Sequence, residues 1–215
     1  MLEAYSAQRE AIAHPYTWTM HPAAALVPIK DFRLAKRRLA SFLSSDERQA
    51  LARSLADAVL SALTPINTYV ACDDPEVARF AEERNAAVIL TPSRGLSSAV
   101  THAVTRLSEH GIKQVGVVNA DIIDGTGVQR LIVDTEGIAL VPDRAGHGTN
   151  VIVVPTACSF RFSYGPGSFT RHRNSAAQTG LPIHIETYRS WCTDIDTPPD
   201  VPSRWWLADA QRFAT

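Results

Sequence analysis

Short apolar segments alternate with helix-like segments along most of this 215-residue chain. The apolar runs are strand-sized, whereas the stretches between them repeat apolar residues every three or four positions. Strands that alternate with helices predict an α/β domain with a mainly parallel sheet, because each helix returns the chain across the sheet. We expect strands at 24–28, 68–71, 87–90, 115–118, 138–141, 151–154 and 184–188, and helices at 45–62, 75–85, 95–110, 168–179 and 203–213.

Composition narrows the class of protein. A hydrophobic content of 45% with 20% charged residues is ordinary for a globular domain, and the net charge of −1 argues against a nucleic-acid binder. No apolar run reaches the roughly 18 residues of a membrane span. The cysteines Cys72, Cys158 and Cys192 are widely spaced, which suggests neither a disulfide framework nor a zinc site. We expect a cytoplasmic protein with no nucleic-acid or membrane partner, built as a single domain after a flexible extension at 1–22.

Polar segments follow several expected strands at their carboxyl ends. Lys30, Asp121 and Asp143 each lie just beyond a strand, and Ser93-Arg94-Gly95 follows another. In open α/β sheets, ligands bind beyond the carboxyl ends of the strands. The sequence therefore predicts that these segments share one rim.

Two glycine-rich runs are suited to binding anions. The run at 142–150, PDRAGHGTN, directly follows a strand, and Gly165-Pro166-Gly167-Ser168 opens an expected helix. Glycines let backbone N–H groups approach an anion closely, and a helix N-terminus favours negative charge. Ser168 is expected to bind a phosphate or carboxylate there, with Arg171 assisting. We interpret His172 as structural or as a hydrogen-bond donor, not as a general base.

A cationic segment follows the first strand. Lys30 is the strongest candidate for a contact to a triphosphate, since lysine acts on phosphate as a point charge. The segment lacks the Walker pattern, which argues against a P-loop ATPase. A solvated basic helix start is the alternative interpretation.

Spaced carboxylates suggest a magnesium site. Asp121 ends a buried strand, where an unpaired carboxylate is costly. Asp194 and Asp196 would point to the same side if that segment is extended. Magnesium in nucleotide sites is held by one or two carboxylates and phosphate oxygens. Alternatively, Asp194 and Asp196 cap a helix before Pro198, and Asp124 is interpreted as a turn or helix cap.

The segment Gly95-Leu96-Ser97 opens a helix whose free N–H groups and hydroxyls are suited to a base or ribose. A simple helix cap explains the segment equally well.

The ordered motifs resemble a known family, the phospholactate guanylyltransferases of deazaflavin coenzyme F-420 biosynthesis. They cover about residues 24–202 and read VPIKDFRLAKRRLA, RGLSSAV, NAD, VPDRAGHGTN, YGPGSFTRH and DIDTP. The resemblance implies a Rossmann-like nucleotidyltransferase fold in residues 23–215. It also implies transfer of GMP from GTP to 2-phospho-L-lactate, phosphoenolpyruvate or 3-phospho-D-glycerate, with release of pyrophosphate.

The resemblance assigns roles by position. Magnesium would lie on Asp121 and Asp196, with Asp194, and the catalytic residues would be Lys30, Asp121 and Asp196. The remaining contacts fall into two groups: the nucleotide would meet Lys30, Lys36, Arg37, Gly95, Leu96, Ser97 and Asp121, and the phospho-acid would meet Thr149, Gly165, Ser168 and Arg171.

The chain departs from the family pattern at two places. Ile122-Ile123 stands where Leu-Pro is usual, and Ser97 stands where Asn is common. Two other functions stay open: a nucleotidyltransferase with another acceptor or base, such as a sugar phosphate or a molybdopterin, and a non-catalytic domain that binds a nucleotide or phospho-acid. Against the former, the G-x-G-x-R loop of those relatives is missing after the first strand. The sequence leaves open whether the protein is a monomer or a homodimer.

Overall fold

A computed structural model describes residues 22–91 and 95–201. The expected extension at 1–22, apart from residue 22, lies outside the described residues, as do Ser93, Arg94 and the expected helix at 203–213. The strands are β1 (Ala23–Pro28), β2 (Asn67–Cys72), β3 (Ala87–Leu90), β4 (Gln114–Val118), β5 (Ile138–Pro142), β6 (Thr149–Pro155) and β7 (Ile183–Ile185). The α-helices are α2 (Ser45–Ala62), α3 (Pro75–Glu82), α4 (Leu96–Glu109), α5 (Val128–Asp134), α6 (Ser168–Gln178) and α7 (Arg189–Cys192); the 3-10 turns are η1 (Phe32–Leu34), η2 (Arg37–Leu39) and η3 (Pro198–Asp200).

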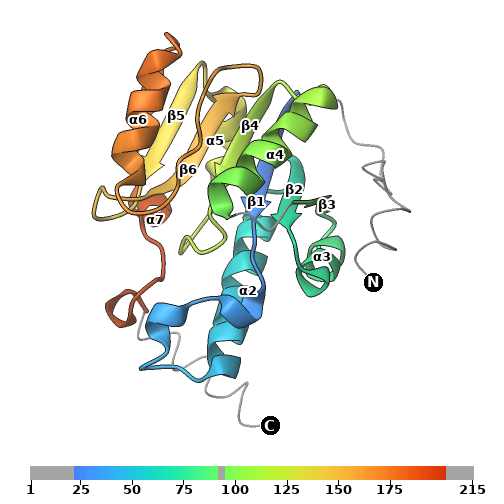
Figure 1. Ribbon diagram of the computed structural model, residues 1–215, viewed down its shortest axis with the longest axis vertical. Coiled ribbons are helices and arrows are strands. Elements are labelled where there is room, and N and C mark those ends of the chain that lie inside the picture. Colours follow the sequence, from blue (N-terminus) through green and yellow to red (C-terminus); the bar gives the residue numbers. More distant parts are fainter. Residues whose placement is uncertain (1–21, 92–94, 202–215) are drawn as a thin grey trace.

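The strands form one seven-stranded sheet in the order β3-β2-β1-β4-β6-β5-β7 (Figure 1). Among these strands, β6 alone runs against the others, since it pairs antiparallel with both β4 and β5. The predicted α/β class with a mainly parallel, mixed sheet is confirmed. Because β6 runs in the opposite direction, its first residue lies at the same edge as the carboxyl ends of the other strands.

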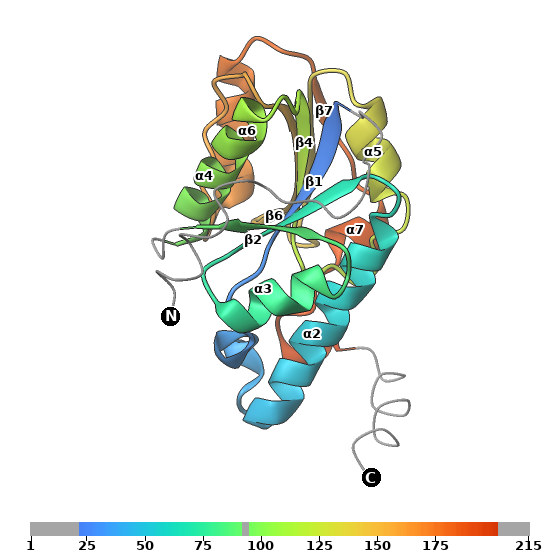
Figure 2. The same cartoon turned by 90° about the vertical axis from the view of Figure 1, so that its right-hand side faces the viewer.

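Helices cover both faces of the sheet. In β1, Ala23, Ala25 and Val27 face the core beneath α2, α3 and α5, whereas Ala24 and Leu26 face the core beneath α4 and α6. This alternation follows from the two-residue period of a strand. Figure 2 shows α4 and α6 on one side of the strands and α2 and α5 on the other.

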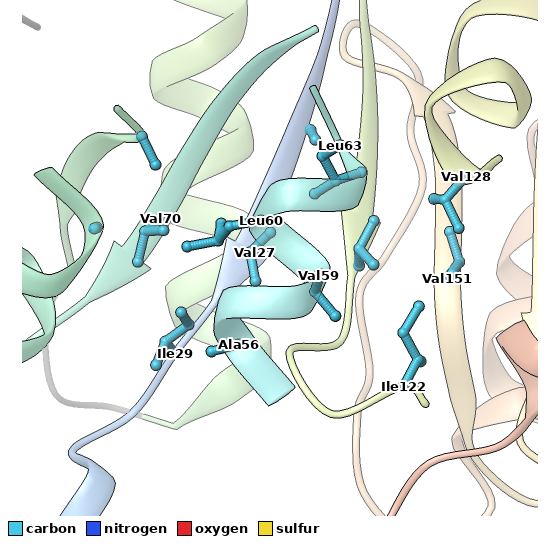
Figure 3. Close-up of a cluster of buried hydrophobic side chains, with 14 of the residues drawn as sticks. Val27, Ile29, Ala56, Val59, Leu60, Leu63, Val70, Ile122, Val128 and Val151 are labelled. Carbon is cyan, nitrogen blue, oxygen red and sulfur yellow. The ribbon is translucent and has the colours of Figure 1, made fainter. Parts of the chain in front are cut away.

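The packing beneath α2 fixes the start of the loop after β1. Apolar side chains of this helix lie in one cluster with Val27, Ile29 and Ile122 (Figure 3). Ser44 begins α2 with a capping box, in which its hydroxyl accepts from the Glu47 N–H and the Glu47 carboxylate accepts from the Ser44 N–H. The helix and the loop are therefore held in a fixed relation to the sheet.

Three elements differ from the sequence-based expectation. The last strand, β7, spans only Ile183–Ile185, and the short helix α7 follows it. The helix α5 is not expected from the sequence, because its seven residues make too few turns for a periodic pattern.

Among the helices described, none has the length and apolar character that a membrane crossing demands.

Candidate functional site

The predicted rim exists at the carboxyl edge of the sheet. The segments after β1, β4 and β5 all leave the sheet at this edge, and β6 begins there with Thr149. Lys30 and Asp143 follow β1 and β5 within two residues, and Asp121 lies three residues beyond β4.

A buried lysine binds the carboxylate beyond β4. Lys36 Nζ lies 2.6 Å from Asp121 Oδ2, although the two residues are 85 positions apart. The Lys36 side chain is only 6% exposed. Its backbone adopts the left-handed conformation, with φ of 53°, which is strained for a residue with a Cβ atom. The backbone is therefore strained at Lys36, the residue whose side chain reaches the rim.

A second segment joins Asp121 through backbone hydrogen bonds. Ile122 and Asp194 form an antiparallel bridge. The Ile123 N–H donates to Thr193 O at 2.8 Å, and the Ile195 N–H donates to Asp121 O at 3.2 Å. This pairing brings Asp194 beside Asp121 from a distant part of the sequence. A proline at 123 would lack the N–H group that donates to Thr193 O, so Ile123 gives this chain a backbone hydrogen bond that a proline could not form.

The carboxylates of this segment have contrasting surroundings. Burial raises the pKa of Asp194 to about 6, and the negative charges of Asp121 and Asp196 add to the shift. Asp196 is more exposed and accepts from Arg38 Nη1 at 2.5 Å. Asp124 accepts from the Thr126 N–H, as expected for a turn cap. Three acidic residues thus gather where two cations approach from the loop after β1.

No metal site is preformed in the described residues, since no group of three or more His, Cys, Asp or Glu side chains is arranged to hold a metal ion. Asp121 and Asp196 each use one oxygen on a cationic side chain. The donor set itself consists of carboxylate oxygens, which are the ligands that Mg²⁺ prefers. The carboxylate groups at this place are therefore chemically suited to bind Mg²⁺.

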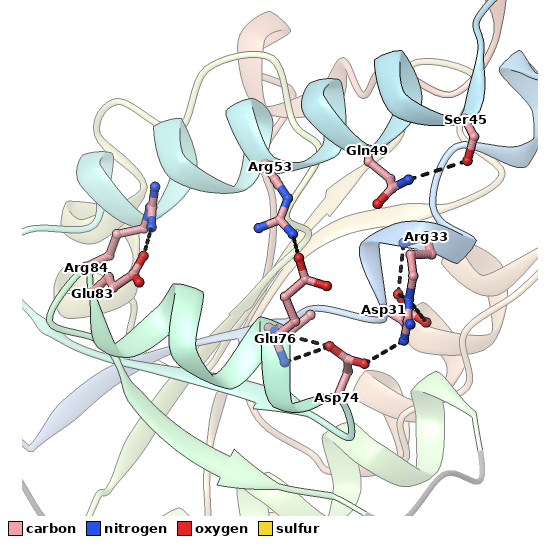
Figure 4. Close-up of polar contacts among 10 residues, drawn as sticks. Asp31, Arg33, Ser45, Gln49, Arg53, Asp74, Glu76, Glu83 and Arg84 are labelled. Carbon is pink, nitrogen blue, oxygen red and sulfur yellow. Dashed lines mark hydrogen bonds and ion pairs between the residues drawn. The ribbon is translucent and has the colours of Figure 1, made fainter.

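The loop after β1 is anchored by an ion pair to the N-cap of α3. Arg33 donates to Asp31 and to Asp74, and Asp74 also caps α3 by accepting from two backbone N–H groups of its first turn (Figure 4). Lys30 and Arg37 are exposed, and in the described part of the chain neither side chain has a hydrogen-bonding or ion-pair partner. The anchored loop thus presents two exposed cations that have no partner among residues 22–91 and 95–201.

Asp143 organises the glycine run after β5. Its Oδ1 accepts from the His147 N–H at 2.8 Å, and its Oδ2 accepts from the Gly148 N–H at 2.6 Å. A Cβ atom at Gly148 would lie 2.6 Å from Asp143 Oδ2, so a larger residue there would displace the carboxylate from its present position. The carboxylate therefore holds the loop that leads into Thr149.

Thr149 is buried and joined to His172. His172 Nδ1 lies 2.9 Å from Thr149 Oγ1, and His172 Nε2 accepts from the Ser163 N–H at 2.8 Å. The imidazole is fully buried, which lowers its pKa to about 4, with a further contribution from Arg171. The ring is therefore neutral at pH 7, and it agrees with the expected structural, hydrogen-bonding role.

The loop at 163–167 is shaped by Arg171. Its guanidinium donates to the carbonyls of Ser163 and Pro166, at 3.0 Å and 2.6 Å. Gly165 lies in this loop with φ of 111°, a conformation that favours glycine. Ser168 begins α6 and is 2% exposed. Arg171 thus positions the loop that carries the predicted acid contacts Gly165 and Ser168.

The N-terminus of α4 lies beside this loop. Gly95 precedes the helix with φ of 90° and no side-chain cap, and the Leu96 side chain packs partly into the core. The Ser97 hydroxyl accepts from the Tyr164 N–H at 2.9 Å. The helix start that is predicted to contact the nucleotide is therefore hydrogen-bonded to the loop at 163–167. This loop is predicted to contact the phosphorylated acid and is called the acid loop below.

Some participants carry no sequence signal. Arg38 lies in a run of cations, and the pattern does not distinguish it from its neighbours. Asp200 accepts from Arg144 at 2.6 Å and from the Thr197 N–H and hydroxyl, so it ties the 194–200 segment to the glycine run. The contacts of Arg38 and Arg144 join residues far apart in sequence, so the sequence pattern does not indicate them. For Asp200, the three-residue spacing from Thr197 is typical of a helix cap, and this spacing is the signal that could have indicated its role.

Comparison with known proteins shows the family of this chain. A model of the family described as "Guanylyl transferase CofC like" matches residues 23–203. A phosphoenolpyruvate guanylyltransferase from Sphaerobacter thermophilus is 35% identical over 185 residues, which cover 82% of this chain and 89% of that protein. A 2-phospho-L-lactate guanylyltransferase from Methanocaldococcus vulcanius is 28% identical over 181 residues, covering 82% and 81%.

Solved structures show the same fold. A putative nucleotide-diphospho-sugar transferase from Desulfovibrio desulfuricans superposes with a TM-score of 0.69 at 16% identity, covering 91% of this chain and 90% of that one. The resemblance inferred from the motifs is confirmed by the family model and the curated relatives. The chain belongs to the guanylyl transferase CofC-like family.

Proposed function

We propose that the protein transfers GMP from GTP to a phosphorylated three-carbon acid and releases pyrophosphate, as a step in coenzyme F-420 biosynthesis. The acid is 2-phospho-L-lactate, phosphoenolpyruvate or 3-phospho-D-glycerate. The relatives named above support both the reaction and this substrate class.

One observation carries the proposal. The carboxylates of Asp121, Asp194 and Asp196 lie near one another at the rim, beside two segments whose composition is suited to anions. The cationic loop contacts two of these carboxylates through Lys36 and Arg38, and the glycine run contacts the same segment through the bond from Arg144 to Asp200. Two anionic substrates that must react with each other require such an arrangement of positive charge and backbone donors.

Asp121, Asp194 and Asp196 would hold Mg²⁺. The ion would neutralise charge on the triphosphate and on the pyrophosphate leaving group. Lys36 and Arg38 already offset the charge of two of these carboxylates. The three acidic side chains can therefore stay close together in the free protein.

The chain's own residues bind and orient the two substrates. We assign Lys30 and Arg37 to the triphosphate, since both are exposed and without a partner among the described side chains. Gly95, Leu96 and Ser97 would face the guanosine with the first N–H groups of α4, which lack intrahelical acceptors. Thr149, Gly165 and Ser168 would hold the acid with the assistance of Arg171, whose guanidinium also donates to the carbonyls of Ser163 and Pro166.

The reaction needs no general base. A phosphate monoester has its second pKa near 6, so the acid's phosphate is largely a dianion at pH 7. One of its oxygens forms a bond to the α-phosphorus of GTP as the bond from that phosphorus to the β-phosphate oxygen breaks, and pyrophosphate leaves with the electron pair. Consistently, His172, the buried histidine nearest the acid loop, has both ring nitrogens in hydrogen bonds to the protein.

Pyrophosphate release tests the proposal. The purified protein is supplied with Mg²⁺, GTP and each of the three acids in parallel, and then with CTP or ATP in place of GTP. We expect release that requires both GTP and one of the acids. GTP binding without turnover on any acid would instead support a non-catalytic binding domain, and release with another base would overturn the assignment of the nucleotide.

Site variants locate the chemistry. Asp121→Asn and Asp196→Asn keep the size of each side chain but remove its charge, and we expect turnover to fall by about 100-fold or more in each. Asp124→Asn is the matched control, because Asp124 caps a turn by accepting from Thr126. Near-normal turnover in Asp121→Asn would contradict the proposed role of the carboxylates.

A further inference from the structure

The imidazole of His172 links the acid loop to the hydroxyl of Thr149. It is fully buried between β6 and the loop at 163–167, and it makes one hydrogen bond at each ring nitrogen. Tyr164 packs edge-on against the ring, with centroids 4.9 Å apart. The position and plane of the imidazole are therefore fixed by its surroundings.

The proton positions follow from the partners. The Ser163 backbone N–H is a donor only, so His172 Nε2 must be the unprotonated acceptor. In a neutral imidazole, the proton then lies on Nδ1 and is donated to Thr149 Oγ1. Burial lowers the pKa of His172 to about 4, which keeps the ring neutral at pH 7.

This leaves the Thr149 hydroxyl proton without an acceptor in the part of the chain that the structure describes. Oγ1 is occupied by the histidine as an acceptor, and no acceptor for its own proton exists among the described residues. Thr149 is 3% exposed, and it lies at the first position of β6, on the rim. A buried hydroxyl that lacks an acceptor is free to donate to an anionic ligand.

We propose that His172 is a positioning residue that, by donating its Nδ1–H to Thr149, fixes the Thr149 hydroxyl as a donor to the phosphorylated acid. The inference rests on the proposed function for the identity of the acid. Through the same ring, Nε2 holds the Ser163 end of the loop that carries Gly165 and Ser168.

Two substitutions separate the functions of the ring nitrogens. His172→Asn places an amide donor near the position of Nδ1 and removes the acceptor for Ser163. His172→Gln places an amide oxygen near the position of Nε2 and removes the donor to Thr149. Both variants lose the aromatic ring, so each is the matched control of the other for lost packing against Tyr164.

The kinetic prediction distinguishes the pair. We expect His172→Gln to raise KM for the acid about 10-fold, with KM for GTP and kcat changed less than about 2-fold. We expect a rise of less than about 3-fold in His172→Asn. In a Thr149→Val background, the His172→Gln change should no longer alter KM for the acid. Equal effects of the two histidine substitutions, or an undiminished effect of His172→Gln in the Thr149→Val background, would overturn the proposal.

Nitrogen NMR of the wild-type protein tests the same point without any variant or turnover. We expect His172 to carry its proton on Nδ1 at pH 7, and a proton on Nε2 or on both nitrogens would overturn the inference. Failure of the wild-type protein to turn over any acid would instead overturn the proposed function. The two failures are therefore distinguishable.

Discussion

The buried neutral histidine predicts a specific dependence of stability on pH. The pKa of His172 is about 4 in the folded protein, against 6.5 in an unfolded chain. Between these values the unfolded state binds a proton that the folded state does not, so stability is fully present above pH 6.5 and is lost as the pH falls toward 4. At about 1.4 kcal/mol per pKa unit, the loss is on the order of 3 kcal/mol across the whole interval, and about 2 kcal/mol by pH 5.

Chemical denaturation of the wild-type protein and of His172→Gln measures this loss. Other groups also titrate in this range, so the informative quantity is the difference in free energy of unfolding between the two proteins. We expect that difference to become smaller by about 2 kcal/mol between pH 7 and pH 5. His184→Gln, at an exposed histidine of β7, is the control for the same substitution at the surface. A His172→Gln difference that is the same at pH 7 and pH 5 would refute the reasoning.

Three further substitutions test other parts of the site. Lys36→Met leaves Asp121 without its 2.6 Å partner, and we expect turnover to fall by about 100-fold, measured as pyrophosphate release. Asp143→Asn keeps one acceptor of two, so we expect a loss of about 1 kcal/mol in denaturation and a higher KM for the acid. Ile123→Pro removes the 2.8 Å bond to Thr193 O, and we expect about 1–3 kcal/mol lower stability with lower kcat.

Each of these substitutions has a control. Lys113→Met changes an exposed lysine away from the rim and should leave turnover unchanged. Asp143→Glu retains the charge, and a KM as high as that of Asp143→Asn would point to loop geometry instead of the number of acceptors. Ile123→Ala keeps the N–H group, so equal loss in Ile123→Ala and Ile123→Pro would show that the side chain, not the hydrogen bond, is responsible.

Local sequence pattern predicts much of the fold because the strands are short and strongly apolar. The residues of β1 are buried almost throughout, and the helices expected at 75–85 and 95–110 begin within one residue of the observed starts of α3 and α4. The rim follows from one rule about the carboxyl ends of strands. The antiparallel direction of β6 is not predictable in this way, because a buried strand has the same pattern in either direction.

The contacts within the site depend on tertiary structure. Nothing near Lys36 indicates that it reaches Asp121, since the cationic segment contains several equivalent side chains. The position of Asp194 depends on a single bridge to Ile122. His172 stands out in the sequence only as a member of a motif; its two hydrogen bonds require β6 and the loop at 163–167 to be in place. Pairings at such separations leave no periodic trace in one sequence.

The central claim is that an oxygen of the acid's own phosphate attacks the α-phosphorus of GTP. The most direct test supplies the acid with ¹⁸O in its phosphate group and locates the label in the guanylylated acid by the isotope shifts of its ³¹P NMR signals. We predict one guanylylated acid per pyrophosphate, with ¹⁸O in the bridge to the phosphorus that comes from GTP and none in the pyrophosphate; a GTP-derived phosphorus that is not bonded to ¹⁸O would mean that another oxygen of the acid attacks. Label in pyrophosphate, or GTP consumption without a guanylylated acid, would contradict the account.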